Sequence, residues 1–106
     1  MGKVNQKEFI KFVGIKEEDS FERSQAIAEG EKTFLKLKPI IKSETNLKVH
    51  VKAFEVEGRR KKYSVTSMLR SPDHFFEAKS EKWAFLEAVR DSLKTLELTV
   101  KRKMKR

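Results

Sequence analysis

The chain has 106 residues, of which 39% are charged and 38% hydrophobic, and its formal net charge is +9. This size predicts one domain with one core, and the positive charge favours nucleic acid, an acidic protein surface or anionic lipid as a partner. The absence of cysteine excludes disulfides and thiol chemistry, two isolated histidines argue against a zinc site, and no apolar run approaches the ~18 residues of a membrane span. We therefore expect a soluble cytoplasmic protein without a cofactor or metal.

The first third of the chain predicts a strand followed by a helix. Residues 7–16 (KEFIKFVGIK) carry β-forming residues, with an edge or a bulge near Gly14. The segment EEDS then supplies acids and a capping residue for a helix from about Phe21. Gly30 weakens this helix, and Pro39 should bend or end it. We expect its apolar stripe to consist of Phe21, Ile27, Phe34 and either Leu35 or Leu37.

The middle of the chain predicts a β-hairpin. Residues 47–58 (LKVHVKAFEVEG) alternate between apolar and polar at the two-residue period of a half-buried strand. The apolar parity switches at Phe54, which predicts a bulge or a strong twist before the turn at Gly58. GRRKK then forms a basic tip that leads into a strand over 63–69 (YSVTSML).

The last third predicts a short strand and a long helix. Pro72 ends the preceding strand, and FFEAK, from Phe75, starts the next one. Ser80 is expected to cap the last helix, and residues 102–106 are expected to fray because the apolar stripe ends at Val100. That stripe consists of Leu86, Val89, Leu93, Leu96 and Val100.

The resulting order, β-α-β-β-β-α, predicts an α+β fold in which one four-stranded mixed sheet has two helices packed on one face. We expect a single RNA-binding-like α+β domain over residues 1–100 and a basic C-terminal tail over 101–106.

The sequence offers no set of groups that predicts an enzyme. The four glycines are scattered, so neither a P-loop nor a dinucleotide-binding fingerprint is present. The acids at 17–19 lie where a helix is expected to begin, and negative charge there complements the helix dipole. His50 alternates with lysines on a polar strand face, and His74 has no partner for acid–base chemistry. We therefore expect a binding protein and no catalytic residues.

Most aromatic side chains are expected in the core. Phe75 and Phe76 are neighbours in a strand and must point to opposite faces of the sheet. One of them therefore faces away from the helices, and only that ring is a candidate platform for stacking on a base.

The basic residues fall into three groups, and all of them except His50, Lys105 and Arg106 are candidate nucleic-acid-binding residues. They are the hairpin cluster Arg59, Arg60, Lys61 and Lys62; the strand face Lys48, His50 and Lys52; and the last-helix group Arg90, Lys94, Lys101, Arg102, Lys103, Lys105 and Arg106. In the last group, Arg90, Lys94 and Lys101 share one flank of the helix. Each single lysine is explained by solvation, but the tail and hairpin together favour phosphate contact.

The run WAFLEAVRDSLKTL, residues 83–96, resembles the last helix of the ribosome hibernation promoting factor and ribosome-associated inhibitor family. That helix carries an apolar, acidic, Ala, apolar, any, Asp, any, Leu pattern, matched here at 86–93, and it too ends in a basic tail. In element order and length the resemblance extends over residues 9–103, and it is to the short form of the family.

The resemblance implies a non-enzymatic protein that binds ribosomal RNA of the small ribosomal subunit through basic residues of its helices. The implied contacts are Arg23 in the first helix and Arg90, Lys94, Lys101, Arg102 and Lys103 in the last. A hibernation or translation-inhibition factor is therefore the leading interpretation. The alternatives are a non-ribosomal, double-stranded RNA-binding module and a protein-interaction domain with a basic surface.

Overall fold

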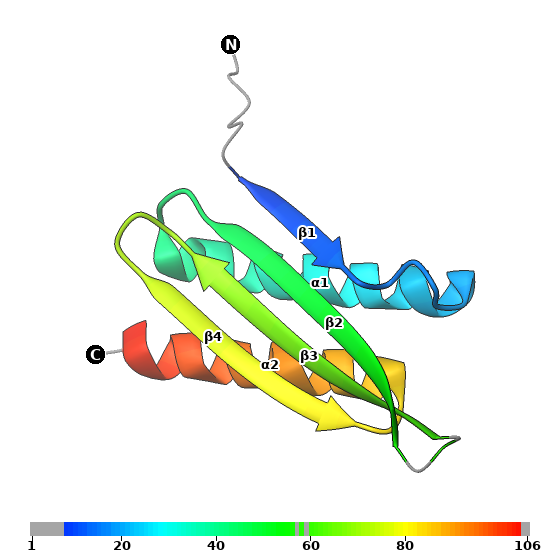
Figure 1. The fold of residues 1–106 in the computed structure, drawn as a ribbon. Coiled ribbons are helices and arrows are strands. Elements are labelled where there is room, and N and C mark those ends of the chain that lie inside the picture. Colours follow the sequence, from blue (N-terminus) through cyan, green and yellow to red (C-terminus); the bar gives the residue numbers. More distant parts are fainter. Residues whose placement is uncertain (1–7, 57, 59, 105–106) are drawn as a thin grey trace.

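Four strands and two helices follow one another in the predicted order (Figure 1). The computed structural model describes residues 8–56, 58 and 60–104. Its elements are β1 (Phe9–Val13), α1 (Ser20–Ile41), β2 (Asn46–Val56), β3 (Arg60–Arg70), β4 (Phe75–Lys82) and α2 (Phe85–Met104). Neither of these helices is long and apolar enough to cross a membrane.

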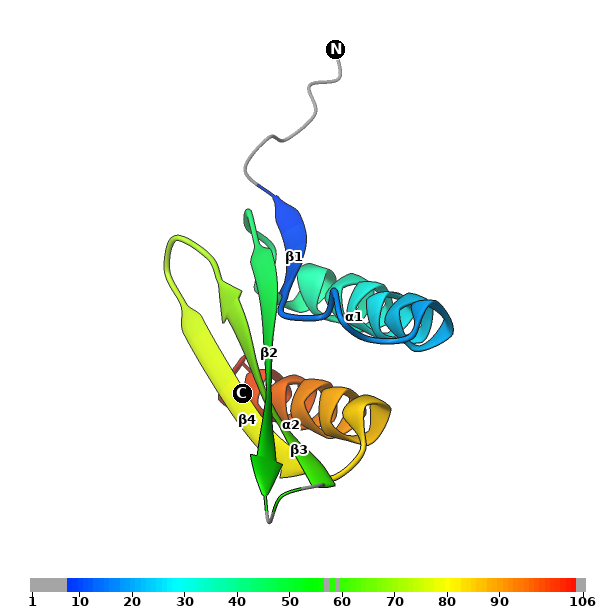
Figure 2. The ribbon, with the colours of Figure 1, turned by 45° about the vertical axis from the view of Figure 1, so that its right-hand side comes forward.

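The strands lie in the order β1-β2-β3-β4, and both helices pack on the same face of the sheet (Figure 2). β1 and β2 pair in parallel because α1 forms the crossover between them, whereas the other two pairings are antiparallel. The predicted fold class is confirmed. The face without helices is called the open face below.

Strand alternation divides the sheet into a core side and an open face. Leu47, Val49 and Val51 of β2 are buried under the helices, and Lys48 and His50 between them are exposed. The register of β2 with β3 runs without interruption from Asn46–Arg70 to Val56–Arg60. This continuous register excludes a bulge near Phe54, one of the two predicted alternatives. The apolar parity changes because neither side of the last residues of β2 is buried.

The hairpin is longer than predicted. β3 begins at Arg60, so Arg60, Lys61 and Lys62 are strand residues that pair with the end of β2 and not part of a loop. Arg59, which was predicted at the same tip, lies outside the described residues. Continuous pairing up to the turn fixes which face each of the three described cations occupies, because successive strand residues point to opposite faces.

Asp19 caps the N-terminus of helix α1: its carboxylate accepts hydrogen bonds from the backbone N–H groups of Phe21 and Glu22 at 3.1 and 3.2 Å. The predicted stripe is correct at Phe34 and, of the two alternatives, at Leu37, but it is wrong at Phe21 and Ile27, which are 67% and 38% exposed. The buried side of α1 consists instead of Ala26, Gly30, Thr33, Phe34, Leu37 and Ile41.

Small residues on α1 allow the helix to lie close to β1. A Cβ on Gly30 would stand 2.5 Å from the ring of Phe12, so the glycine makes room for that ring. Pro39 lies inside α1, which ends two residues later at Ile41; Lys42 follows in the left-handed conformation, with its N–H donating to the Lys38 carbonyl. Gly30, expected only to weaken the helix, therefore has a packing role.

Helix α2 begins at Phe85 and not near Ser80. Ser80 is a buried residue of β4, and its hydroxyl donates to the Asp91 carboxylate at 2.6 Å, which ties the strand to the helix. The expected fraying does not hold for residues 102–104, because Met104 lies one turn after Val100 and packs against the core. Residues 105 and 106 lie outside the described residues.

Two buried serines set the distance between α2 and the sheet. The Ser92 hydroxyl donates to the Ala78 carbonyl at 3.1 Å and lies 2.7 Å from the hydroxyl of Ser67. Both serines have no exposed surface. Side chains this small, with their hydroxyls paired, let the helix backbone approach β3 and β4 closely.

Candidate nucleic-acid interface

A shallow groove of about 240 Å³ runs between α1 and α2 on the side away from the sheet. It is called the interhelix groove below, and its charged lining consists of Glu29, Lys32 and Lys36 from α1 and Arg90, Lys94 and Glu97 from α2. Lys101 continues the α2 side, since steps of four, three and four residues return to the same flank of a helix. Five cations face two carboxylates, so the groove is net positive.

Ion pairs across the interhelix groove hold several of these side chains. The Arg90 guanidinium donates to Glu29 at 3.1 Å, and Glu97 accepts from Lys101 at 2.9 Å and pairs with Lys36 at 3.7 Å. Lys32 and Lys94 form no ion pair within the described part of the chain. These two ammonium groups are the ones most open to an external phosphate.

Glu97 is the acid at the centre of this arrangement. The hydrogen bond from Lys101 lowers its pKa below the ordinary value of 4.5, helped by the positive charges of Lys101, Lys36 and Lys94 and opposed by partial burial. A carboxyl whose pKa is lower in the folded protein contributes stability above its unfolded pKa, and that contribution disappears as the pH falls through the folded pKa.

We expect Glu97→Gln to lower the thermal midpoint at pH 7, where the free-energy loss is less than about 1 kcal/mol because the paired lysines are about half exposed. The loss should be smaller at pH 3 than at pH 7, because the parent carboxyl becomes neutral as the pH falls through its lowered pKa. Thermal unfolding followed by circular dichroism at both pH values measures this. Glu31→Gln is the control, since Glu31 is exposed on α1; an equal loss at pH 3 and pH 7 would contradict the assignment.

Arg23 of α1 is engaged within the protein. Its guanidinium donates to the carbonyls of Lys16 and Glu18 at 3.0 and 3.1 Å, so it holds the loop between β1 and α1. Arg102 and Lys103 are exposed in the last turn of α2, where positive charge complements the helix dipole. Of the predicted helix residues, Arg90, Lys94 and Lys101 come together along the interhelix groove, and Arg23 does not join them.

The predicted strand cations lie on the other side of the molecule. Lys48 and Lys52 are exposed on the open face, as their alternation predicts. Arg60 and Lys62 also belong to the open face, where the Arg60 guanidinium lies 3.9 Å and the Lys62 ammonium 5.0 Å from the centre of the Trp83 ring. Lys61 points to the helix side, where its charge opposes the rise in the pKa of Glu18 that burial causes. The candidate residues therefore form two surfaces.

Several residues of these surfaces were missed in the sequence. A sequence pattern could have identified Lys32 and Lys36, because their four-residue spacing places both on one polar flank of α1. Arg70 lies beside Phe75 on the open face, with its guanidinium 5.1 Å from the ring centre, and the pairing of the two strands that places it there has no local signal. The expectation that one of Phe75 and Phe76 faces away from the helices is confirmed: Phe75 is 50% exposed and Phe76 is 7% exposed.

The fold resembles solved structures of known proteins. The N-terminal domain of Protein Y from Thermus thermophilus matches with a TM-score of 0.61 and 19% identity, over 89% of this chain and 94% of that one. A ribosomal subunit interface protein from Coxiella burnetii matches with a TM-score of 0.67 and 13% identity, over 93% of this chain and 99% of that one. The chain therefore shares the fold of these two proteins. The resemblance noted in the sequence is thus confirmed at the level of the fold. No protein-family model and no curated protein sequence matches the chain.

Proposed function

We propose that this protein is a non-enzymatic, ribosome-associated RNA-binding factor that binds the small ribosomal subunit and acts in ribosome hibernation or translation inhibition. The observation that carries the proposal is the interhelix groove: on a fold shared with a ribosomal subunit interface protein, two helices present five cations along one shallow channel. Ribosomal RNA is the partner whose charge this arrangement fits.

The chemistry of the interhelix groove supports phosphate binding. Arg90 and Lys101 are held in place by Glu29 and Glu97, so they lose little side-chain entropy when a phosphate approaches. Lys32 and Lys94, which lack such pairs in the described structure, supply the charge that is not already neutralised. Contacts of this kind position an RNA backbone without reading its sequence.

Loss of the two least engaged lysines should weaken the complex with small subunits. We expect Lys32→Gln/Lys94→Gln to reduce the affinity about tenfold at low salt and to lower the slope of log K against log salt by about two, because two phosphate contacts are removed. Co-sedimentation with purified small subunits over a series of salt concentrations measures both quantities.

The matched control removes the same charge elsewhere. Lys16 and Lys42 are exposed and do not line the interhelix groove, so Lys16→Gln/Lys42→Gln should bind nearly as the parent does. Equal losses in the two double variants would mean that only net charge matters, and parental binding by the groove variant would move the contact to the open face.

Comparing a naked A-form RNA duplex with small subunits over the same salt series distinguishes the alternative functions. A double-stranded RNA-binding module should bind a naked A-form duplex as tightly as it binds small subunits, since it recognises the shape of the duplex. A protein-interaction domain should show no steep salt dependence toward either RNA. Preference for intact subunits together with a steep salt slope is the result expected of the proposed function.

A further inference from the structure

The open face carries a hollow at the end of the sheet where β1 and β4 have their N-termini. It has a volume of about 270 Å³ and is lined by Phe9, Asn46, Lys48, Met68, Arg70 and Phe75. The strand register places Phe9, Asn46, Arg70 and Phe75 in one row across all four strands. The hollow is smaller than a pocket for a drug-sized ligand, which is typically about 300–1,000 Å³, and suits a single ring system.

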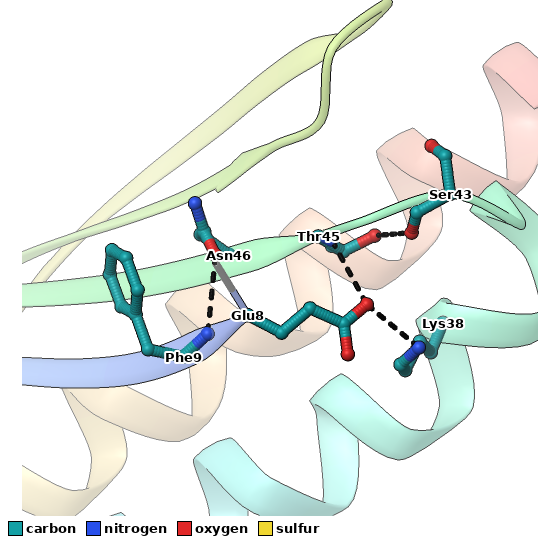
Figure 3. Close-up of polar contacts among 6 residues, drawn as sticks. All are labelled: Glu8, Phe9, Lys38, Ser43, Thr45 and Asn46. Atoms are coloured by element: carbon teal, nitrogen blue, oxygen red, sulfur yellow. Dashed lines mark hydrogen bonds and ion pairs between the residues drawn. The ribbon is translucent and has the colours of Figure 1, made fainter. Parts of the chain in front are cut away.

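Two exposed aromatic rings stand at opposite edges of this hollow. Phe9 is 48% and Phe75 50% exposed. The backbone N–H of Phe9 donates to the Asn46 side chain at 3.2 Å, while the Glu8 carboxylate accepts from Thr45 and pairs with Lys38 of α1 at 2.8 Å (Figure 3). These contacts fix the start of β1, so the Phe9 ring keeps its place at the edge of the hollow.

The opposite end of the open face repeats this combination of an aromatic ring with cations. Trp83 is 42% exposed and lies under the Arg60 guanidinium and the Lys62 ammonium. Phe54, which pairs with Lys62 across the hairpin, is 39% exposed on the same face. Phe75 begins β4 and Trp83 directly follows its last residue, so the two rings are eight residues apart, which corresponds to about 27 Å in an extended strand.

The charge between the two ends is strongly positive. The register places seven cations but only two carboxylates, Glu77 and Glu81, on the open face of the described strands. The cations are Lys11, Lys48, Lys52, Arg60, Lys62, Arg70 and Lys79. One carboxylate, Glu81, is already within 4.0 Å of Lys62.

We propose that the open face is a binding site for single-stranded RNA, in which one unpaired base stacks in the hollow between Phe9 and Phe75 and a second stacks at Trp83. Lys48 and Arg70 contact the phosphates next to the first base, and Arg60 and Lys62 contact those next to the second. Exposed aromatic rings on a positively charged sheet are the features by which single strands are bound with little sequence preference.

The charge of this face favours an RNA strand over a protein segment as the occupant. An apolar peptide would fill the hollow but would leave Lys48 and Arg70 without a partner, whereas each nucleotide brings both a flat ring and a phosphate. The Arg70 guanidinium, stacked on Phe75, extends the flat surface and keeps its charge at the rim of the hollow. The site lies on the opposite side of the sheet from the interhelix groove and does not depend on the function proposed for that groove.

The test uses the single tryptophan of the chain as a probe. A ten-nucleotide RNA without self-complementarity should quench Trp83 fluorescence and bind in an anisotropy assay, and the duplex formed with its complement should bind more weakly to this face and quench less. Phe75→Ala should reduce the affinity for the single strand about 5- to 150-fold, the range for loss of one stacked base. Phe21→Ala is the matched control, because that ring is also exposed but lies on α1.

A second variant separates stacking from apolar contact. Phe75→Leu keeps an apolar side chain of similar size but removes the aromatic ring, so it should lose nearly as much affinity as Phe75→Ala. Full affinity in Phe75→Leu, or no quenching of Trp83 by the single strand, would overturn the proposal and favour an apolar protein segment. Lys16→Gln/Lys42→Gln removes two charges outside both surfaces and should bind the ten-nucleotide RNA nearly as the parent does. Quenching of Trp83, which lies on the open face, reports this site and not the interhelix groove.

Discussion

Replacing Gly14 with alanine is expected to lower the free energy of unfolding by about 3 kcal/mol or more. Gly14 follows β1 with a φ of +88°, a conformation that costs a residue with a Cβ about 1–2 kcal/mol. The added Cβ would also stand 2.0 Å from the carbonyl oxygen of Val51 in β2. Because both this oxygen and the Gly14 backbone belong to the joint between β1 and β2, relief requires the two strands to move apart.

The size of this effect can be measured against a second glycine of similar conformation. Gly58 has a φ of +80°, but beyond its two chain neighbours a Cβ placed there meets no atom of the described residues within 4 Å. Gly58→Ala therefore measures the cost of the backbone conformation alone. In denaturant unfolding, Gly14→Ala should lower the free energy of unfolding by at least about 1 kcal/mol more than Gly58→Ala does. Equal losses in the two variants would show that the chain relaxes around Gly14 and that the contact with Val51 is not limiting.

The parts of the fold that could be predicted are those in which one side of an element is fully buried. Alternation over 47–51 placed β2 and its faces correctly, and the apolar stripe of α2 is buried at Val89, Leu93, Leu96 and Val100. In both cases one side of the element removes a large apolar area from water, so apolar residues repeat clearly along the sequence at the period of a strand or a helix.

Helix α1 could not be predicted in the same detail because its packing depends on small residues. Ala26, Gly30 and Thr33 are buried, whereas Phe21 and Leu35 are exposed. Hydrophobic periodicity gives weight to large apolar side chains, so it correctly selected Phe34 and Leu37 but also selected the exposed Phe21 and Ile27 and overlooked the small buried residues. The reason for a small residue at Gly30 is the Phe12 ring of β1, which is distant in the sequence.

The candidate site divides in a similar way. Local spacing placed Lys48 and Lys52 on the open face and Arg90, Lys94 and Lys101 on one flank of α2. The ion pair between Arg90 and Glu29 joins residues 61 positions apart, and no local pattern predicts it. Sequence reasoning therefore identified most of the cations but not the acids that hold them or the separation into two surfaces.

Binding to small ribosomal subunits is expected to weaken about a thousandfold between 50 and 200 mM monovalent salt. An RNA-binding protein that neutralises several phosphates releases counterions, and six contacts give a loss of this size. The interhelix groove can supply five of them through Lys32, Lys36, Arg90, Lys94 and Lys101, and exposed Arg102 or Lys103 can supply a sixth.

The two carboxylates of the interhelix groove should also affect the affinity for small subunits. Glu29 and Glu97 already neutralise part of the charge, and a phosphate must compete with them for Arg90, Lys36 and Lys101. Glu29→Gln should therefore raise the affinity at 50 mM salt and leave Arg90 free for the phosphate. Titrations of labelled protein with small subunits, repeated at four salt concentrations, give the slope for the parent and for this variant. An affinity that stays constant from 50 to 200 mM would reject phosphate neutralisation as the source of binding, because the release of counterions makes such binding weaken with added salt.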